Sequence, residues 1–343
     1  MMPIYIKTTN ACNLSCEHCF IAKADKADKR MMNTEQVGII MDKLKTYYKY
    51  DMLQFNWYGG EPMMSGISFF NHILANYKDE RIIHYLQTNL TLINEKWYPI
   101  IEKLFDGSIC TSYDLSRRLG DSYDAFYQKW WKTYEKTKEQ FDIVVRITIT
   151  KETTQKGASW VTDIIGQLDA NIIILDYFFP NGTGKNNKKK LFVPYHDYYA
   201  FAENIKRLCR EKHPNTTVEI NNNIRKVSTV NGDDGHFCST CADNMLVIEP
   251  DGSVYNCIIM SGEEEHYIGN ILHDDVEDII FSTKNIEHIV KQKSFYCDCE
   301  HYQNCNGGCY LIRSATDKAD CKRVFAESSQ RGRSYVRTTA REM

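Results

Sequence analysis

Hydrophobic and polar positions along residues 1–180 follow two patterns that alternate with each other. Short runs that are apolar or alternate with polar residues, as in strands, cover 4–8, 53–58, 82–86, 109–113, 143–150 and 171–178. Apolar residues at helical spacing mark the segments near 33–48, 69–77, 95–105, 123–140 and 160–168. Repeated strand–helix units predict an α/β fold built on a parallel sheet. Six such units are too few to close an eight-fold barrel.

Local signals place several further elements. Asn33-Thr34-Glu35-Gln36 fits a capping box and predicts the start of the first long helix. After the sixth strand, residues 181–190 are polar and rich in lysine, which predicts a flexible loop. Its lysines indicate a solvated face or, alternatively, a contact with an acidic peptide. Residues 196–212 predict a helix, and the turn Pro250-Asp251-Gly252 predicts a β-hairpin around it.

Composition narrows the class of protein. The chain has 343 residues, of which 43% are hydrophobic and 25% charged, as in soluble globular proteins. A formal net charge of −3 gives no indication of nucleic-acid or membrane partners. No apolar run approaches the ~20 residues of a membrane span, and no signal peptide opens the sequence. We therefore expect a cytoplasmic protein.

Cysteines carry the clearest chemical signal. There are thirteen; three lie within residues 12–19 and eight between 238 and 321. In a reducing compartment such clusters indicate metal binding or catalysis rather than disulfides. Cys12, Cys16 and Cys19 have the spacing CxxxCxxC directly after the first strand. Three thiolates can hold three irons of a 4Fe–4S cube and leave the fourth iron open. A structural zinc loop is the alternative, but such sites usually have four ligands, and His18 is the one nearby candidate.

This spacing resembles the signature of the radical S-adenosylmethionine (SAM) enzymes, in which the open iron chelates the amino and carboxylate groups of SAM. The resemblance implies a partial (β/α)6 TIM-like barrel, here residues 1–190, and the six predicted units fit it. It also implies that the chemistry lies at the carboxyl ends of the strands.

A second motif follows the second strand. Gly59, Gly60, Glu61 and Pro62 resemble the GGEP motif of that family, which holds the amino group of SAM. Glycines allow a backbone to approach a ligand closely, and a carboxylate can accept hydrogen bonds from an ammonium group. Taken alone, the segment could be an ordinary glycine-rich turn.

Two polar segments follow the third and fourth strands. Gln87-Thr88-Asn89 resembles a segment whose side chains face SAM or substrate, which implicates Gln87 and Asn89. Leu90 stands where the family often has a glycine. Alternatively, Gln87-Thr88-Asn89 could be ordinary polar residues at the end of a strand, without a role in binding. Ser112 and Asp114 resemble a serine-x-aspartate segment near the ribose and carboxylate of SAM, although Leu115 replaces the usual glycine.

Two single residues complete the expected SAM site. Arg146, within the fifth strand, could pair with the SAM carboxylate. It could equally extend outward or pair with a structural acid. His18 occupies the position where the family usually has an aromatic residue, often tyrosine, whose backbone reaches adenine.

The cysteine-rich end resembles the SPASM extension of radical SAM enzymes. Gly252 and Cys257 have its glycine-x4-cysteine spacing, and Cys299, Cys305 and Cys309 match its next block. The first pair of that block, Cys297 and Cys299, has the spacing CxC where the family has CxxC. The resemblance implies a first auxiliary cluster on Cys238, Cys241, Cys257 and Cys309. It implies a second on Cys297, Cys299, Cys305 and Cys321.

This assignment uses eleven of the thirteen cysteines and predicts three 4Fe–4S clusters in all. Cys110 and Cys209 remain as core or surface residues. Two zinc ribbons are the competing interpretation. We expect four segments: the barrel over 1–190, a bridging helical segment over 191–235, the SPASM domain over 236–325, and a basic tail over 326–343.

The resemblance implies that one electron cleaves SAM and that the resulting 5′-deoxyadenosyl radical removes a hydrogen atom from the substrate. A flavodoxin- or ferredoxin-type donor would supply the electron. Relatives with two auxiliary clusters act mainly on peptides and proteins. We therefore predict an oxidase that matures a ribosomally made peptide by a thioether or C–C link. The motif begins at residue 12, so a leader peptide would bind the barrel and tail or a separate protein.

Three other functions stay open. Anaerobic sulfatase-maturating enzymes, as a family, have a catalytic aspartate directly after the cysteine that follows the hairpin turn. That position is Ile258 here, which counts against this activity. A dehydrogenase of a carbohydrate or other small molecule is a second alternative. A non-catalytic zinc or electron-carrier protein is a third. For the enzyme, the sequence does not identify a catalytic base.

Overall fold

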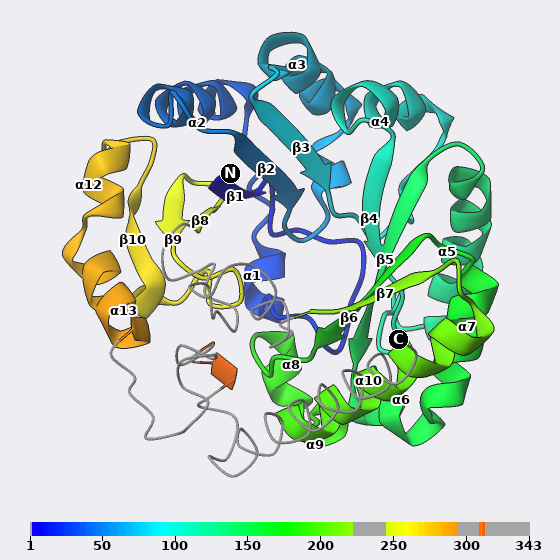
Figure 1. Cartoon of the computed structure of the whole chain (residues 1–343). Coiled ribbons are helices and arrows are strands. Elements are labelled where there is room, and N and C mark those ends of the chain that lie inside the picture. The colour runs from blue at the N-terminus through cyan, green and yellow to red at the C-terminus, as the bar shows by residue number, and fades with distance from the viewer. Residues whose placement is uncertain (1, 222–244, 294–308, 310, 313–343) are drawn as a thin grey trace, which may run out of the picture.

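The computed structural model describes residues 2–221, 245–293, 309, 311 and 312. Its centre is a curved layer of parallel strands in chain order, surrounded by helices (Figure 1). The strands are β1 (Met2–Lys7), β2 (Leu53–Tyr58), β3 (Ile82–Leu86), β4 (Ser108–Ser112), β5 (Asp142–Ile149) and β6 (Ile172–Tyr177). An isolated parallel bridge between Gln87 and Cys110 connects the sheet of β1–β3 to that of β4–β6. The predicted α/β partial barrel is confirmed.

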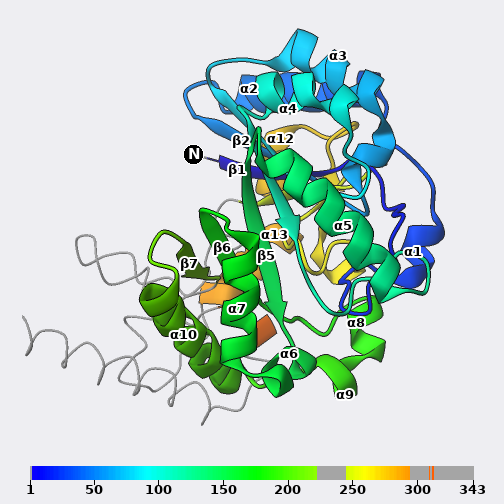
Figure 2. The same cartoon turned by 90° about the vertical axis from the view of Figure 1, so that its right-hand side faces the viewer.

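The helices cover the outside of this layer (Figure 2). They include α2 (Thr34–Tyr47), α3 (Ile67–Tyr77), α4 (Tyr98–Leu104), α5 (Tyr123–Lys138), α7 (Ala158–Leu168) and α10 (Tyr195–Lys212). The predicted capping box forms at the start of α2, where Asn33 and Gln36 exchange side-chain and backbone hydrogen bonds. Val37, Ile40, Met41 and Leu44 are buried at helical spacing, so the apolar stripe read from the sequence faces the core.

The sheet continues beyond the six predicted strands at both edges. On one side β7 (Thr217–Ile220) pairs parallel with β6. On the other, β8 (Leu246–Ile248) pairs parallel with β1 and antiparallel with β9 (Ser253–Tyr255), and β10 (Tyr267–Asn270) follows. The hairpin predicted around Pro250 therefore forms, and it attaches the carboxyl-terminal part of the chain to the first barrel strand. A 3-10 turn (Glu264–His266), α12 (Val276–Ile280) and α13 (Thr283–Lys293) complete this part.

Several short elements were not predicted. They are α1 (Lys23–Ala27), a 3-10 turn (Pro62–Ser65) and α6 (Lys151–Lys156). The helix predicted over 95–105 is a 3-10 turn (Glu95–Trp97) followed by α4, with a proline in its first turn. The loop predicted over 181–190 is wrong in detail, because α8 (Thr183–Asn186) and α9 (Lys188–Leu191) lie there. Hydrogen bonds to the cysteine loop fix that segment, as described below.

The two faces of the strands differ in chemistry. On β1, Ile4 and Ile6 are fully buried in the core that the helices cover. Because side chains alternate along a strand, Tyr5 and Lys7 lie on the opposite, inner face. By the same alternation Arg146 on β5 and Asp176 on β6 lie on that inner face. The inner face of the sheet therefore carries charged side chains, which its outer face lacks at these positions. Among the described residues, no helix is long and apolar enough to cross a bilayer.

Candidate functional site

The cysteine loop follows β1. Cys16 is buried, and Cys12 and Cys19 are partly buried beside it. Burial raises the pKa of the Cys12 thiol to about 12 and also raises that of Cys16. Thiolates at these positions therefore need a bound metal or nearby cations. The chain provides such cations: the Lys26 amine hydrogen-bonds to Cys19, and a guanidinium nitrogen of Arg117 lies 4.0 Å from the Cys16 sulfur.

The arrangement fits a cluster better than a single ion. Within the described ranges, no three His, Cys, Asp or Glu side chains converge closely enough to hold one metal ion. A 4Fe–4S cube, by contrast, places each thiolate on a different iron. His18, the one nearby candidate for a fourth zinc ligand, instead bonds the Ser116 hydroxyl through Nδ1. Its Nε2 lies 3.5 Å from Asp114. Burial lowers the pKa of His18 to about 4, so its ring is neutral.

Gly59 and Gly60 bring the end of β2 against the cysteine loop. An ideal Cβ on Gly60 would lie 2.1 Å from the carbonyl oxygen of Ala11, and one on Gly59 would lie 2.4 Å from that of Thr9. The Gly60 amide donates to the Thr9 carbonyl over 2.8 Å, and the Glu61 amide donates to the Ala11 carbonyl over 2.9 Å. The close approach that requires glycine is thus an approach to the chain's own backbone.

Glu61 joins two of the predicted motifs. Its carboxylate is buried and accepts hydrogen bonds from the Asn89 amide at 2.7 Å, the Thr88 hydroxyl at 2.7 Å and the Met63 amide at 3.1 Å. Burial raises the pKa of Glu61 in spite of these bonds. In this structure its oxygens therefore hold the turn after β3, with Pro62 beginning a 3-10 turn. A contact with the SAM amino group stays a prediction.

The segment after β3 turns sharply. Asn89 donates to the Asn13 side chain over 2.7 Å, which connects this segment to the cysteine loop, whereas Gln87 is exposed. Leu90 adopts a φ of +70°, in the left-handed region that favours glycine. This conformation gives a physical reason for the glycine that often follows this motif in the family.

Asp114 organises the next segment. One carboxylate oxygen accepts from the Thr148 amide at 2.6 Å, and the other accepts from Nε of Arg117 at 3.0 Å. Arg117 in turn faces Cys16, so Asp114 reaches the cysteine loop through this guanidinium as well as through His18. Ser112, the last residue of β4, is also buried.

Arg146 already has a partner within the protein. Its Nε donates to Asp176 over 2.7 Å, and Asn221 donates to the same carboxylate over 2.6 Å. The structure therefore places Arg146 with an acid, one of the arrangements that the sequence left open. A SAM carboxylate would have to share this guanidinium with Asp176.

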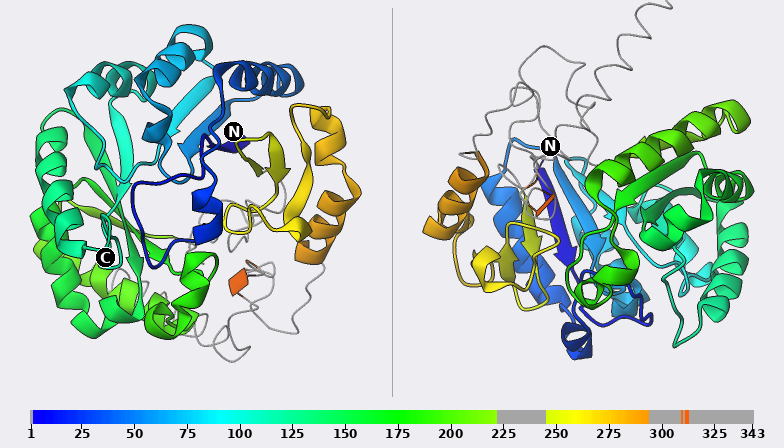
Figure 3. Two further views of the ribbon diagram at one scale, coloured as in Figure 1. Left: turned by 180° about the vertical axis from the view of Figure 1, so that it is seen from behind. Right: turned by 90° about the horizontal axis from the view of Figure 1, so that it is seen from below.

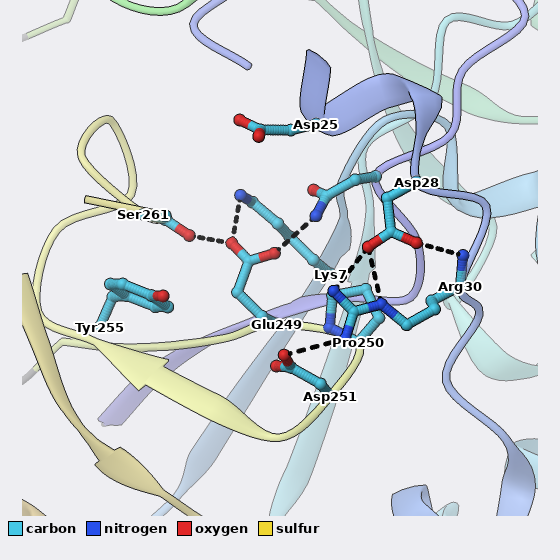
Figure 4. Close-up of a pocket in the computed structure, with 11 residues that line it drawn as sticks. Lys7, Asp25, Asp28, Arg30, Glu249, Pro250, Asp251, Tyr255 and Ser261 are labelled. Atoms are coloured by element: carbon cyan, nitrogen blue, oxygen red, sulfur yellow. Dashed lines mark hydrogen bonds and ion pairs between the residues drawn. The ribbon is translucent and has the colours of Figure 1, made fainter. Parts of the chain in front are cut away.

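A cavity of about 250 Å³ lies beside β1 and the β8–β9 hairpin (Figure 4). Lys7 and Glu249 form an almost fully buried ion pair in its wall. Glu249 also accepts from Asn10 Nδ2 at 2.9 Å and from the Ser261 hydroxyl. Neither residue of this pair was predicted as part of a site from the sequence. The available signal was a charged residue at the carboxyl end of an otherwise apolar strand, once in β1 and once directly after β8.

The cavity lies close to one predicted auxiliary-cluster ligand. Cys257 and Cys309 are buried and interact electrostatically, and burial raises the pKa of Cys257 to about 12. The Tyr58 hydroxyl is buried near both Glu249 and Cys257, and burial raises its pKa. Six predicted ligands lie outside the described residues: Cys238, Cys241, Cys297, Cys299, Cys305 and Cys321.

Known proteins resemble this chain over most of its length. A cysteine-type anaerobic sulfatase-maturating enzyme of Clostridium perfringens strain 13 is 25% identical over 340 residues, covering 91% of this chain and 89% of that enzyme. A serine-type anaerobic sulfatase-maturating enzyme of Klebsiella aerogenes is 23% identical over 322 residues, covering 87% of this chain and 77% of that enzyme.

Solved structures share the fold. The structure described as native anSMEcpe with bound AdoMet has a TM-score of 0.75 at 21% identity, covering 96% of this chain and 98% of that one. Streptococcus suis SuiB bound to precursor peptide SuiA has a TM-score of 0.68 at 17% identity, covering 92% of this chain and 73% of that one.

Two family models match the sequence. The model of the radical SAM superfamily matches residues 6–156, which include the cysteine loop and the Gly59–Pro62 motif. The model of the SPASM iron–sulfur cluster-binding domain matches residues 238–310. The chain therefore belongs to the radical SAM superfamily and carries a carboxyl-terminal SPASM domain.

Proposed function

We propose that this protein is a radical SAM oxidase that modifies a peptide or a protein segment. The observation that carries the proposal is its end-to-end similarity to sulfatase-maturating enzymes, which spans 91% of this chain. Related folds have also been solved with peptides: anSMEcpe with the Cp18Cys peptide and SuiB with SuiA. Those ligands belong to those proteins, and they support an extended peptide as the substrate class here.

The SAM site would be formed where the motifs meet. Cys12, Cys16 and Cys19 would hold the cluster, and the polar segments that end β2, β3 and β4 would surround SAM. When bound, the 4Fe–4S cluster would supply the electron that cleaves SAM and starts the reaction. The protein's own contribution is to hold the substrate carbon in position and to exclude water. We also propose that the SPASM domain holds two auxiliary clusters.

Glu249 is our candidate for the group that accepts the proton released when the substrate is oxidised. Ile258 stands at the position of the catalytic aspartate of sulfatase-maturating enzymes, and an isoleucine side chain cannot accept a proton. Glu249 lines the cavity, and Lys7, Asn10 and Ser261 all donate hydrogen bonds to its carboxylate, which fixes its position there. A cavity of about 250 Å³ is large enough for one or two residues of a peptide.

The bond formed separates the two candidate activities. The similarity to sulfatase-maturating enzymes favours oxidation of one cysteine or serine to formylglycine, whereas Ile258 counts against that reaction. A thioether or C–C link remains the other candidate. Both classes need a peptide, and a flavodoxin- or ferredoxin-type donor would supply the first electron to either.

The experiment uses the full chain, reconstituted anaerobically with iron and sulfide. It is incubated with SAM, a chemical reductant and one of two peptides. One peptide is a sulfatase segment with its target cysteine, and the other is any short peptide whose gene is found next to that of this protein. We expect 5′-deoxyadenosine and an oxidised peptide. A thioether or C–C link removes two hydrogens, whereas oxidation of the cysteine to an aldehyde removes two hydrogens and also exchanges the sulfur, released as sulfide, for an oxygen from water. A product that reacts with hydrazide reagents indicates formylglycine, and a cysteine protected from alkylation indicates a thioether. Release of 5′-deoxyadenosine with neither peptide altered, and with a carbohydrate oxidised instead, would overturn the proposal.

A further inference from the structure

A lysine-rich face lies on three short helices near the end of the barrel. Helices α6, α8 and α9 carry six exposed lysines and one glutamate, although the whole chain has a net charge of −3. These lysines are Lys151, Lys156, Lys185, Lys188, Lys189 and Lys190. We call this surface the lysine face. Such a local excess of one charge attracts molecules of the opposite charge.

The lysine face is attached directly to the back of the cysteine loop. The Gly184 amide on α8 donates to the carbonyl oxygen of Cys19 over 2.9 Å. The Asn187 side chain donates to the carbonyl oxygen of Glu17 over 3.0 Å. An ideal Cβ on Gly182 would lie 2.1 Å from the carbonyl oxygen of Phe20, so only glycine permits this approach. Figure 3 shows α8 beside the segment that connects β1 to α1.

One lysine, Lys190, is held by ion pairs, and the amines of Lys156 and Lys188 lie over the rings of Trp160 and Phe192, at 6.0 Å and 5.1 Å from the ring centres. Lys190 pairs with Glu17 at 2.7 Å and with Glu152 at 3.1 Å. Burial acts to raise the pKa of Glu17, but Lys190 and Arg118 outweigh it and hold that pKa below its ordinary value. In the part of the chain that the structure describes, no acidic side chain lies within 4 Å of the amines of Lys185, Lys188 and Lys189.

We propose that the lysine face is the docking surface for an acidic one-electron carrier of the flavodoxin class. The cluster predicted on Cys12, Cys16 and Cys19 has to be reduced from outside the protein. Cys19 is one hydrogen bond away from α8, so a carrier docked on the lysine face would stand directly behind this cluster. One electron leaves the reduced flavin and enters the cluster, and no bond to the protein forms or breaks. The inference needs the family's cluster but not the peptide substrate proposed above.

The test compares two electron sources on the same variants of the full chain. The triple variant Lys185→Glu, Lys188→Glu, Lys189→Glu reverses three charges that have no acidic partner among the described residues, and it leaves Lys190 in place. A matched control changes three exposed lysines elsewhere, Lys96→Glu, Lys103→Glu and Lys129→Glu. Cleavage of SAM is measured with dithionite and with a reduced acidic flavodoxin, at low and high salt. Carbodiimide cross-linking to the flavodoxin, followed by mass spectrometry, reports binding without any need for activity.

With flavodoxin at low salt, we expect the triple variant to cleave SAM roughly tenfold more slowly than the unmodified protein, and the difference to shrink at high salt. With dithionite, both variants should cleave SAM at a rate within about twofold of that of the unmodified protein. This result would also show that the cluster is intact. Cross-links should involve Lys185, Lys188 or Lys189. Equal losses with both reductants, equal effects of the control variant, or cross-links confined to other surfaces would overturn the proposal. Cross-linking of these lysines to an acidic substrate peptide but not to flavodoxin would also overturn it.

Discussion

Lys7, the last residue of β1, and Glu249, directly after β8, form an ion pair whose side chains are only 3% and 8% exposed. The pair joins the first barrel strand to the hairpin that leads to Cys257. Charges this well buried depend on each other, because an unpaired charge in the interior is costly. This mutual dependence leads to two predictions, one on stability and one on the reaction.

On stability, we expect Glu249→Gln to lower the free energy of unfolding by about 3–5 kcal/mol, because it leaves the Lys7 ammonium buried without a counter-charge. The double variant Lys7→Met, Glu249→Gln should recover a large part of this loss. Chemical denaturation of the metal-free protein measures both. If the effects of the single variants Lys7→Met and Glu249→Gln simply add in the double variant, the two residues are not coupled as the structure indicates.

On the reaction, Glu249→Gln should separate SAM cleavage from substrate oxidation. Removing a general base typically costs a factor of about 10²–10⁴, so peptide product should fall by at least ~10²-fold. Release of 5′-deoxyadenosine should change far less. Asp251→Asn is the matched control, because Asp251 lines the same cavity but is 40% exposed and pairs with Arg30. Equal product yields from both variants would exclude Glu249 as the proton acceptor.

Gly60→Ala should disrupt the cysteine loop without touching a cysteine. Its Cβ would lie 2.1 Å from the Ala11 carbonyl oxygen, so the loop before Cys12 would have to move. We expect the variant to fold but to bind less iron at this cluster, measured by iron content and visible absorbance. Gly66→Ala is the control: it is strained at φ +86°, but its Cβ would meet nothing within 4 Å. A Gly60→Ala protein with full iron content would show that this contact is not needed.

His84 gives a prediction for pH. Its Nδ1 accepts from the Trp57 indole at 3.0 Å, and its Nε2 lies 3.1 Å from the Tyr77 carbonyl oxygen, which requires a neutral ring. Burial lowers the pKa of His84 to about 4, well below the usual value near 6.5. The unfolded chain therefore binds a proton between these values and the folded protein does not, so stability is full above pH 6.5 and falls as the pH drops toward 4.

The loss amounts to at most ~3 kcal/mol for this one group. Because carboxylates also titrate in this range, the measurement is the difference in unfolding free energy between the unmodified protein and His84→Gln. That difference should be largest near pH 7.5 and shrink toward pH 5. A constant difference across this range would contradict the buried neutral ring.

The six barrel strands could be predicted because each is an apolar or alternating run long enough to stand out locally. Strand β8 was predicted only as part of the hairpin around Pro250, whereas β7 has four residues and is held by pairing with β6. Such short runs carry no periodic signal. The local sequence of 181–190 predicts a loop instead of helices α8 and α9, because the order of this segment comes from hydrogen bonds to Cys19 and Glu17, which are remote in sequence.

Several contacts of the motif residues could not be foreseen from the sequence. Glu61 bonds to Asn89 and Thr88 across two strands, and Arg146 bonds to Asp176 on the next strand. Such pairings depend on strand order and register, which a list of motifs does not contain. The same holds for Lys7 and Glu249, which are more than two hundred residues apart and meet only because β8 pairs with β1.

Replacing Cys12, Cys16 and Cys19 together with alanine should abolish SAM cleavage and leave the iron of the carboxyl-terminal clusters in place. Roughly twelve irons per chain would fall to about eight if the three predicted 4Fe–4S clusters are present. Iron analysis of the purified variant, beside an assay for 5′-deoxyadenosine, checks both parts. Continued release of 5′-deoxyadenosine by the triple variant would refute the assignment of these three ligands.

The most direct measurement is electron paramagnetic resonance of the anaerobically reduced protein before and after SAM is added. Three cysteine ligands leave one iron open, so SAM should bind there and change the signal of the reduced cluster, and the triple cysteine variant should show no such change. A spectrum that stays the same at saturating SAM would contradict an open iron at the cysteine loop, and with it the radical chemistry proposed for this protein.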